Sequence, residues 1–306
     1  MLLVLGDVMT DIYVQGQVER ISPDAPVPVL RLSHRTRRMS GACISAQAAY
    51  DVSGSAVTLA GVTGADEQAE FLRTSLSDAG VRSRLAAFPG YPTITKTRFL
   101  TGTHHLLRVD EDSRFHDLAP AVEEHMFGIW HSMRASVSAV LFSDYAKGAL
   151  TETLIRQVVA DARERRIPVV VDSKRRDMSC YRGAQAWTPN DHELALVSGH
   201  EDLQAGASRM RSRLQLDALI VTCAAEGAVV TTDDGIQAFT PPPMHQVRSV
   251  AGAGDVFAGV MTAMVAQGLD WAQATQAGVA HATRYVSHDP AEPRKEPSDN
   301  DSRAWR

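Results

Sequence analysis

The sequence predicts an α/β fold built around a mainly parallel sheet. Short apolar runs typical of buried strands alternate with segments of helical pattern, and polar residues stand where the apolar runs end. The runs with strand character cover residues 2–5, 57–60, 139–142, 168–171 and 219–222. Strands that alternate with helices form right-handed βαβ units, so we expect a sheet that helices cover on both faces.

Two segments between these runs are expected to be helices. Residues 41–52 are small and apolar on several faces, and residues 151–166 repeat apolar side chains at helical spacing with Arg and Glu opposite. The chain has 306 residues, which suffices for one large α/β domain or two ordinary ones.

Two further segments favour extended structure outside this alternation. Residues 12–32 alternate around a turn-like Ser-Pro-Asp-Ala-Pro sequence, and residues 93–109 are rich in side chains that favour strands. We expect these two segments to form a small β-lid over the strand ends. From residue 289 onward Pro, Asp, Glu, Arg and Ser dominate, so 289–306 is predicted to be a disordered tail and 1–288 the folded domain.

The charge and hydropathy of the chain exclude several classes of protein. A net charge of -5 argues against a general nucleic-acid binder, which needs a basic surface. The short cluster Arg35, Arg37 and Arg38 is expected in a solvated loop. The apolar run at 2–5 is too short for a signal peptide, and no stretch approaches the length of a membrane span. We therefore expect a soluble, cytoplasmic protein with neither nucleic acid nor membrane as partner.

The three cysteines do not suggest a disulfide framework or a zinc site. Cys43, Cys180 and Cys223 lie far apart, and no two of them form a CxxC pair. A reducing compartment fits this usage best.

Polar residues follow several of the expected strands directly. They are Asp7, Asp144, Asp172 and Thr222. In open parallel sheets ligands bind beyond the carboxyl ends of the strands, so these residues are candidates for one common site.

The sequence AGAGD at residues 251–255 suggests phosphate chemistry. Residues 252–254 are small enough to let a turn approach an anion, and a helix starting there directs free amides and the positive end of its dipole to that point. Asp255 stands beside them as a possible base. Phosphoryl transfer to a hydroxyl needs both groups. The same residues are also compatible with a helix that Asp caps after a flexible loop.

Further motifs occur along the chain in a fixed order. They are GDVMTD (6–11), ISPDAPVP (21–28), PTITKTR (92–98), LLRVD (106–110), SDYAKG (143–148), YRG (181–183) and TPN (188–190). With the glycine turn, they make the chain resemble the ribokinase-like (PfkB) carbohydrate kinases, and among these the heptose 7-phosphate kinases of ADP-heptose and lipopolysaccharide synthesis. The resemblance covers residues 2 to about 286. It implies a ribokinase-like three-layer fold with a β-lid, ATP and Mg²⁺ as cosubstrates, and often a homodimer through the lid.

The resemblance assigns roles to the glycine turn. Asp255 is expected to be the general base for the sugar hydroxyl, and the amides of Gly252, Ala253 and Gly254 are expected to form the anion hole. Gly252 and Gly254 would also border the nucleotide. We expect bulk at Gly254 to do more harm than bulk at Ala253, because only glycine tolerates every φ value and the closest approach.

The resemblance also implies a nucleotide and metal region. Asn190 and Glu193 have the spacing of the NxxE element that the family associates with magnesium, and their oxygens suit a hard cation that keeps several waters. Asn190 is equally suited to cap a helix. Thr222, Glu226 and Gly227 resemble the loop beside the phosphates and adenosine, although a strand that ends in a glycine turn would look the same.

On the acceptor side, the resemblance implies that Asp11 binds sugar hydroxyls, with Gly41 nearby. Lys96, Arg98 and Arg108 form a basic group on the lid that suits a phosphate already present on the sugar. Simple solvation of these charges is the alternative.

Three more residues at strand ends are candidates for the acceptor site. Lys147 and Lys174 are candidates for contact with phosphate, and Asp144 is expected to orient a sugar hydroxyl or Lys147.

Five positions depart from the family pattern. The family has Asp and Thr where Ser249 and Ala251 stand, a glycine where Ser40 stands, and, in the heptose kinases, asparagines where Ile44 and Ala48 stand. Losing an amide that bonded a substrate hydroxyl costs about 1–3 kcal/mol. These departures leave open whether activity is weakened or redirected.

Three functions remain open from the sequence. The first is ATP-dependent phosphorylation of a sugar phosphate, heptose 7-phosphate to heptose 1,7-bisphosphate. The second is a kinase for another sugar or sugar phosphate. The third is a degenerate family member that binds nucleotide or sugar phosphate without turnover.

Overall fold

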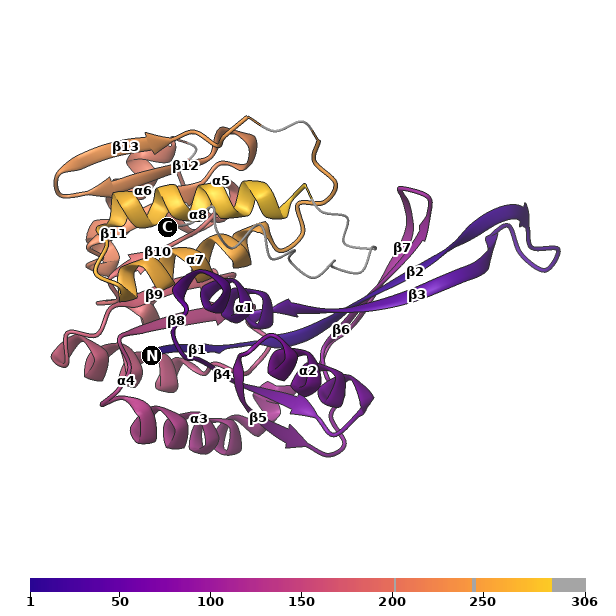
Figure 1. Cartoon of the computed structure of the whole chain (residues 1–306), viewed down its shortest axis with the longest axis horizontal. Helices are drawn as coiled ribbons and strands as arrows, with labels where there is room; N and C mark the ends of the chain where they lie inside the picture. Colours follow the sequence, from indigo (N-terminus) through magenta and orange to yellow (C-terminus); the bar gives the residue numbers. More distant parts are fainter. Residues whose placement is uncertain (201, 244–245, 288–306) are drawn as a thin grey trace.

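A nine-stranded sheet forms the centre of the molecule (Figure 1). A computed structural model describes residues 1–200, 202–243 and 246–287. The strand order is β13-β12-β11-β10-β9-β8-β1-β4-β5, parallel from β11 to β5 and antiparallel at the β12–β13 edge. The strands are β1 Leu2–Gly6, β4 Val57–Gly64, β5 Arg82–Phe88, β8 Ala139–Asp144, β9 Val169–Ser173, β10 Ala186–Trp187, β11 Ala218–Thr222, β12 Ala228–Thr232 and β13 Gly235–Phe239.

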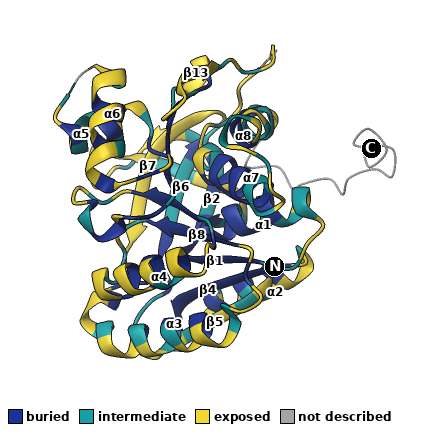
Figure 2. Ribbon diagram, turned by 90° about the vertical axis from the view of Figure 1, so that its left-hand side faces the viewer, coloured by how far each residue is buried: buried dark blue, intermediate teal, exposed yellow. Residues whose placement is uncertain are grey.

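Helices cover both faces of this sheet. Alternate residues of β1 point to opposite sides, so that Leu3 and Leu5 join one apolar core while Leu2 and Val4 join the other. The first core is closed by α3 Ala119–Met133, α4 Glu152–Glu164, α5 Asp191–Ser198 and α6 Leu203–Leu214. The second core is closed by α1 Ala42–Ser53, α2 Glu67–Asp78, α7 Ala253–Ala266 and α8 Trp271–Tyr285. The buried sheet lies between two helical layers whose outer faces are exposed (Figure 2).

The predicted fold class is confirmed. All five apolar runs lie in strands of the central sheet to within one residue, and the two predicted helices are α1 and α4, each within about two residues of the expected bounds. The described residues also form three short 3₁₀ helices, which are η1 Phe115–Leu118, η2 Ser179–Tyr181 and η3 Ala224–Glu226.

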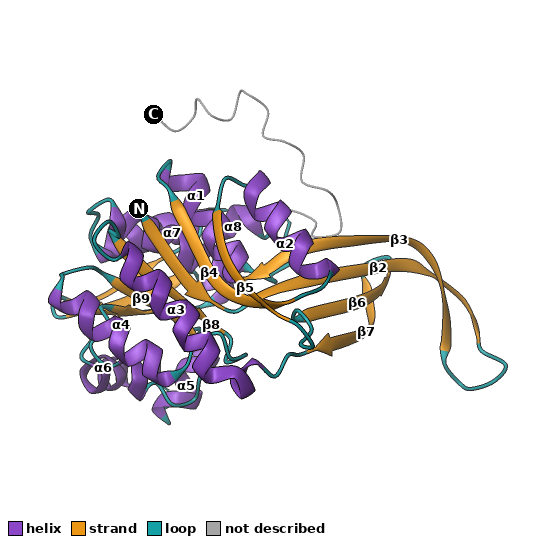
Figure 3. Ribbon diagram, turned by 90° about the horizontal axis from the view of Figure 1, so that it is seen from below, coloured by secondary structure: helices purple, strands orange, loops and turns teal. Residues whose placement is uncertain are grey.

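A second sheet projects from the main body as an arm (Figures 1 and 3). Its order is β3-β2-β6-β7, formed by β2 Val8–Ile21, β3 Pro28–Gly41, β6 Thr95–Thr101 and β7 His104–Glu111. The two segments predicted to be extended, 12–32 and 93–109, lie in this sheet and its turns.

One expectation about this arm is wrong. Arg35, Arg37 and Arg38 lie in β3, which continues to Gly41, rather than in a solvated loop. β3 is an edge strand of 14 residues, and basic side chains are a common feature of exposed edges. Arg37 also pairs with Glu67 of α2 at 2.6 Å.

No helix in the described ranges is long and apolar enough to cross a membrane. The predicted tail at 289–306 lies outside the described residues, as does residue 288.

Candidate active site

The carboxyl ends of the parallel strands bring the predicted polar residues to one edge of the sheet. A cleft of about 960 Å³ opens there, lined by the end of β9, the end of β11 and the start of α7. Its polar lining includes Asp172, Lys174, Asn190, Glu193 and Asp255. Its apolar lining includes Ala224, Ala225, Pro241, Pro242, Pro243, Val247, Val250, Val279, Ala282 and Val286. A cleft with both kinds of lining suits a ligand that has an apolar ring at one end and anionic groups at the other.

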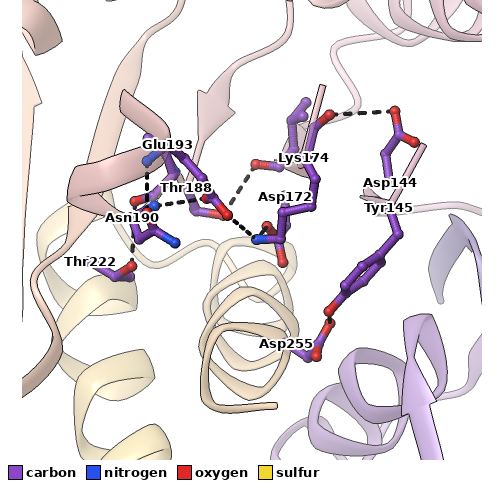
Figure 4. Close-up of polar contacts among 12 residues, drawn as sticks. Asp144, Tyr145, Asp172, Lys174, Thr188, Asn190, Glu193, Thr222 and Asp255 are labelled. Atoms are coloured by element: carbon purple, nitrogen blue, oxygen red, sulfur yellow. Dashed lines mark hydrogen bonds and ion pairs between the residues drawn. The ribbon is translucent and has the colours of Figure 1, made fainter. Parts of the chain in front are cut away.

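Asp255 lies in the first turn of α7 and is only 4% exposed. The hydroxyl of Tyr145 donates a hydrogen bond to its Oδ1 at 2.7 Å (Figure 4). Burial, and then the charge of Asp172, raise the pKa of Asp255 to about 7. A carboxylate with a pKa near neutrality is a suitable general base.

In the glycine turn ahead of Asp255, Gly252 is the position at which the backbone requires glycine. Gly252 has φ +87°, and a Cβ there would lie 2.8 Å from Cδ1 of Ile44 and 2.9 Å from the hydroxyl of Tyr285. Gly254 has no such φ, and a Cβ there would meet nothing within 4 Å. We expected a side chain at Gly254 to be harmful because only glycine tolerates every φ value. That reason is wrong, because the positive φ and the close contacts occur at Gly252.

The three amides predicted for the anion hole are not equivalent. The amide of Ala253 donates to the carbonyl of Val250 at 3.2 Å. Gly254 belongs to the first turn of α7, where helical N–H groups have no acceptor one turn earlier. Gly252, Ala253 and Gly254 all line the cleft.

Asn190 and Glu193 form the N-terminal capping box of α5. Glu193 N donates to Asn190 Oδ1 at 2.7 Å, and Asn190 N donates to Glu193 Oε2 at 3.0 Å. The helix-cap interpretation is confirmed, while the metal role stays a prediction.

Lys174 joins this capping box to the end of β9. Its Nζ lies 2.7 Å from Glu193 Oε1 and 3.2 Å from Asp172 Oδ1 (Figure 4). Burial acts to lower the pKa of Lys174, but the charges of Asp172 and Glu193 outweigh it and raise the pKa above its usual value. Lys174 therefore keeps its positive charge in the cleft.

The oxygen donors here suit a hydrated magnesium ion. Across residues 1–200, 202–243 and 246–287, no three His, Cys, Asp or Glu side chains gather closely enough to hold a metal by themselves. The oxygens of Glu193 already accept from Lys174 and from a backbone amide. A cation that keeps its waters fits this arrangement better than one enclosed by protein ligands.

The residues of the predicted nucleotide loop differ in their position relative to the cleft, and their nucleotide role stays a prediction. Thr222, at the end of β11, lines the cleft. Gly227, directly after η3, also lines it; this glycine has φ +95°, and an added Cβ would lie 1.9 Å from the carbonyl oxygen of Phe239. Glu226 is exposed and does not line the cleft, because η3 directs it to solvent. The prediction that Glu226 contacts the nucleotide is therefore not supported by its position.

The basic group on the second sheet gathers on one face. Asp11 and Lys96 are register partners, as are Arg98 and Arg108, and partners in adjacent strands share a face. Arg98 pairs with Asp11 at 3.0 Å, with both side chains largely buried, and Arg108 makes a two-bond pair with Asp110. Two of the three predicted cations are therefore already matched by carboxylates of the same sheet.

Lys96 links this face to the cleft. Its Nζ lies 5.1 Å from the centroid of the Tyr145 ring, and burial lowers its pKa. Lys147 pairs with Asp112 at 2.5 Å, not with Asp144.

Asp144 does not reach the cleft, contrary to its predicted role. Its carboxylate accepts from Arg175 and from the hydroxyl of Tyr181 at 2.6 Å, and the side chain is fully buried. The amide of Ala146 donates to its other oxygen at 2.8 Å. Asp144 is occupied by a network that ties the ends of β8 and β9 together, so it orients neither a sugar hydroxyl nor Lys147.

Gly41 is the N-cap of α1 and has φ +62°. An added Cβ would lie 2.7 Å from the carbonyl oxygen of Asp7. Its contribution is therefore to let the end of β3 pass close to the residue that follows β1.

The departures from the family pattern have structural correlates. Ile44 and Ala48 pack with Val256 and Val260 of α7 in a small apolar cluster. The two positions at which the heptose kinases carry asparagine thus serve helix packing here. Ser249 accepts a hydrogen bond from the amide of Ala251 at 3.3 Å, within the turn before α7. Nothing in the structure explains Ser40.

The sequence did not predict Tyr145 as a site residue, and it predicted Asp7 only as a strand-end candidate without a role. Asp7 is buried and accepts from the amides of Tyr145, Lys147 and Ala149 at 2.8, 3.1 and 3.0 Å. Tyr145 carries the hydroxyl that binds Asp255. The available signals were the carboxylate directly after β1 and the SDYAKG motif, but neither indicates which residues meet.

The fold is ribokinase-like. Escherichia coli phosphofructokinase-2, solved with substrates and products, superposes with a TM-score of 0.76 at 18% identity, covering 94% of this chain and 92% of that one. Arabidopsis thaliana ribokinase with ribose and ATP gives 0.71 at 17% identity, covering 95% and 93%.

The chain belongs to the pfkB family carbohydrate kinases, whose family model matches residues 1–293. It is 39% identical to the bifunctional protein HldE of Methylobacillus flagellatus over 88% of this chain and 56% of that protein. It is 38% identical to D-beta-D-heptose 7-phosphate kinase of Bordetella bronchiseptica over 89% of this chain and 86% of the relative. The chain thus spans about half the length of the HldE relatives.

Proposed function

We propose that the protein transfers the γ-phosphoryl group of ATP to a sugar phosphate, converting heptose 7-phosphate to heptose 1,7-bisphosphate. The observation that carries this proposal is the position of Asp255, which lines the cleft and is linked through Tyr145 to the basic face of the second sheet. A base at this junction can serve a nucleotide on one side and a phosphorylated acceptor on the other.

The cleft is the proposed ATP site. Its apolar lining suits adenine, and its polar lining with Lys174 and the start of α7 suits the phosphates. Asn190 and Glu193 would hold hydrated Mg²⁺, which when bound neutralises charge on the phosphates.

Asp255 performs the proton transfer in this account. Its carboxylate takes the proton of the attacking sugar hydroxyl as that oxygen bonds to the γ-phosphorus and the bond to ADP breaks. The α7 dipole and the amides of the glycine turn stabilise the charge on the transferred group. Lys174 adds a fixed positive charge in the same cleft.

The basic face of the second sheet is the proposed site for the phosphate that the sugar already carries. Lys96 and Arg108 of this face and Lys147 of the neighbouring β8–α4 loop supply the cations, and Asp110 and Asp112 pair with Arg108 and Lys147. Asp11, which pairs with Arg98, would accept hydrogen bonds from sugar hydroxyls. The name of the 38% identical relative, D-beta-D-heptose 7-phosphate kinase, favours a heptose phosphate as the acceptor.

The test is a panel assay. Purified protein with ATP and magnesium is given heptose 7-phosphate, other sugar phosphates and free sugars, and ADP release is followed. ADP release that depends on heptose 7-phosphate is the expected result. ADP release with another sugar only would mean that the protein is a kinase for that sugar. The apolar cluster at Ile44 and Ala48 favours this second function. Binding of ATP without turnover of any sugar would make this a non-catalytic family member.

Arg108→Gln is expected to raise KM for the sugar phosphate about tenfold with little change in kcat, because a charged hydrogen bond to phosphate is lost in ground state and transition state alike. Steady-state kinetics with the preferred acceptor measures this. The matched control is Arg31→Gln, which removes an exposed arginine paired with Glu19 in the same sheet. An equal effect of both substitutions would remove Arg108 from the acceptor site.

We also propose that the second sheet pairs two copies of the chain. Leu107 and Val109 of β7 are 58% and 46% exposed and lie on the face opposite Arg108, so an apolar contact and the basic face do not compete. Light scattering coupled to gel filtration checks this, with a dimer expected.

Since the reaction consumes ATP, we propose that the protein works in the cytoplasm.

A further inference from the structure

Tyr145 holds the proposed base by one of its two oxygens. Its hydroxyl donates to Oδ1 of Asp255 at 2.7 Å, and among the described residues no hydrogen bond reaches Oδ2. Asp255 also lines the cleft. Burial, and then the negative charge of Asp255, raise the pKa of Tyr145 well above its usual value, so the phenol keeps its proton and acts as a donor rather than as a base.

The carboxylate of Asp7 holds the backbone around Tyr145 in place. The loop between β8 and α4 donates three amides to the buried carboxylate of Asp7. Within this loop Ala146 has φ +56° and Gly148 has φ +103°, and an added Cβ on Gly148 would lie 2.6 Å from the amide of His116. A loop held in this way has little freedom to change the position of the tyrosine.

The ring of Tyr145 is fixed by charges from two different sheets. Lys96 Nζ, from β6 of the arm, lies 5.1 Å from the ring centroid, and Lys174 Nζ, just after β9, lies 5.8 Å from it. Both distances are within the range of cation–π attraction. Two ammonium groups also withdraw electron density from the phenol and strengthen its hydroxyl as a donor.

The titratable groups that act on Asp255 come from several elements around it. Asp172 and Lys174 come from the end of β9, Lys96 from β6, and Tyr145 from the β8–α4 loop. From α1 comes Cys43, whose pKa burial raises to about 12, so that its thiol stays neutral. Among the described residues, Tyr145 donates the one hydrogen bond to the carboxylate of Asp255.

We propose that Tyr145 is a positioning residue: it fixes the carboxylate of Asp255 through Oδ1, keeps it ionised, and leaves Oδ2 for the acceptor hydroxyl. The inference rests on the proposed function, because it assigns a task to a neighbour of the proposed base. It also makes the arm part of the catalytic unit, since Lys96 holds the tyrosine ring from the second sheet.

Tyr145→Phe tests the proposal, because phenylalanine keeps the ring and the contacts with both lysines. Without the donated bond, the ionised form of Asp255 is less stable. The acid limb of the kcat/KM profile, expected near pH 7 in the wild type, should move up by about one to two pH units. The rate at pH 7 should fall about tenfold or more and recover at pH 9, with KM for ATP unchanged.

The matched control is Tyr181→Phe. It removes a hydroxyl that donates to another buried carboxylate, Asp144, at 2.6 Å, outside the cleft. It should lower stability without moving the acid limb. A rate loss in Tyr145→Phe that is uniform with pH would overturn the positioning role.

A second readout does not depend on turnover. The carboxyl carbon of Asp255, assigned by comparison with Asp255→Asn, is titrated by NMR in wild type and Tyr145→Phe. A higher midpoint in the variant is expected, and an unchanged midpoint overturns the proposal. If the wild type phosphorylates no sugar, the proposed function fails while this titration still decides the role of Tyr145.

Discussion

Asp255→Asn is expected to lower kcat for phosphoryl transfer by about 10² to 10⁴-fold while ATP binding stays near the wild-type level. The substitution keeps the shape of the side chain and its contact with Tyr145 but removes the group that takes the proton. ADP release with the preferred acceptor measures kcat, and calorimetry measures ATP binding. Turnover near the wild-type level would remove Asp255 from the role of base.

The same substitution is expected to stabilise the protein at pH 8. Burial, and then the charge of Asp172, raise the pKa of Asp255 from its ordinary value of 3.8 to about 7. Because the folded state has the higher pKa, the contribution of this group is greatest below pH 4 and is lost as the pH rises through 7. Asparagine carries no charge, so the gain should grow between pH 4 and 7, to the order of a few kcal/mol.

Thermal unfolding at pH 5 and pH 8 checks this stabilisation. The exposed Asp217→Asn serves as control and should change neither transition. A gain of the same size at both pH values would mean that the charge of Asp255 is not its cause.

Asp7→Ala is expected to lower the free energy of unfolding by about 3 kcal/mol or more. Three amides of the β8–α4 loop lose their acceptor, and each unsatisfied buried donor costs about 1–3 kcal/mol. Burial, and then Asp144, raise the pKa of Asp7 to about 6, against the effect of the three amides, so the carboxylate is mostly ionised at pH 7.

Urea unfolding at pH 7 measures this loss, with Asp217→Ala as the exposed control. The loop also carries Tyr145, so the variant that remains folded should lose transfer activity as well. A loss of stability below about 1 kcal/mol would show that the loop finds other acceptors and is not held by Asp7.

The layers of the fold could be predicted because they depend on local patterns. Apolar runs such as 139–142 mark buried strands, and the small-residue turn before Asp255 marks the start of α7. The length of β3 could not be predicted, since its basic stretch has the composition of a loop and is held as a strand by pairing with β2. The sequence also does not predict which face of the second sheet each side chain lies on, because the pairing of the strands sets this.

The site was predictable where a residue type and its place on a strand end sufficed, as for Asp255 and Lys174. It was not predictable where the direction of a side chain depends on the loop around it. Asp144 follows a strand as Asp172 does, yet Arg175 and Tyr181 hold it below the cleft. Glu226 follows β11 closely, yet η3 carries it outward. Tyr145 reaches Asp255 across 110 residues of sequence, and no local pattern records that contact.

Phosphorus NMR of the complete reaction tests the central claim most directly. Wild-type protein is incubated with ATP, magnesium and heptose 7-phosphate at pH 8, beside Asp255→Asn. The account predicts a new sugar phosphate signal and ADP in equal amounts in the wild type, and neither above background in the variant. ADP without a new sugar phosphate, or equal product from both proteins, would contradict it.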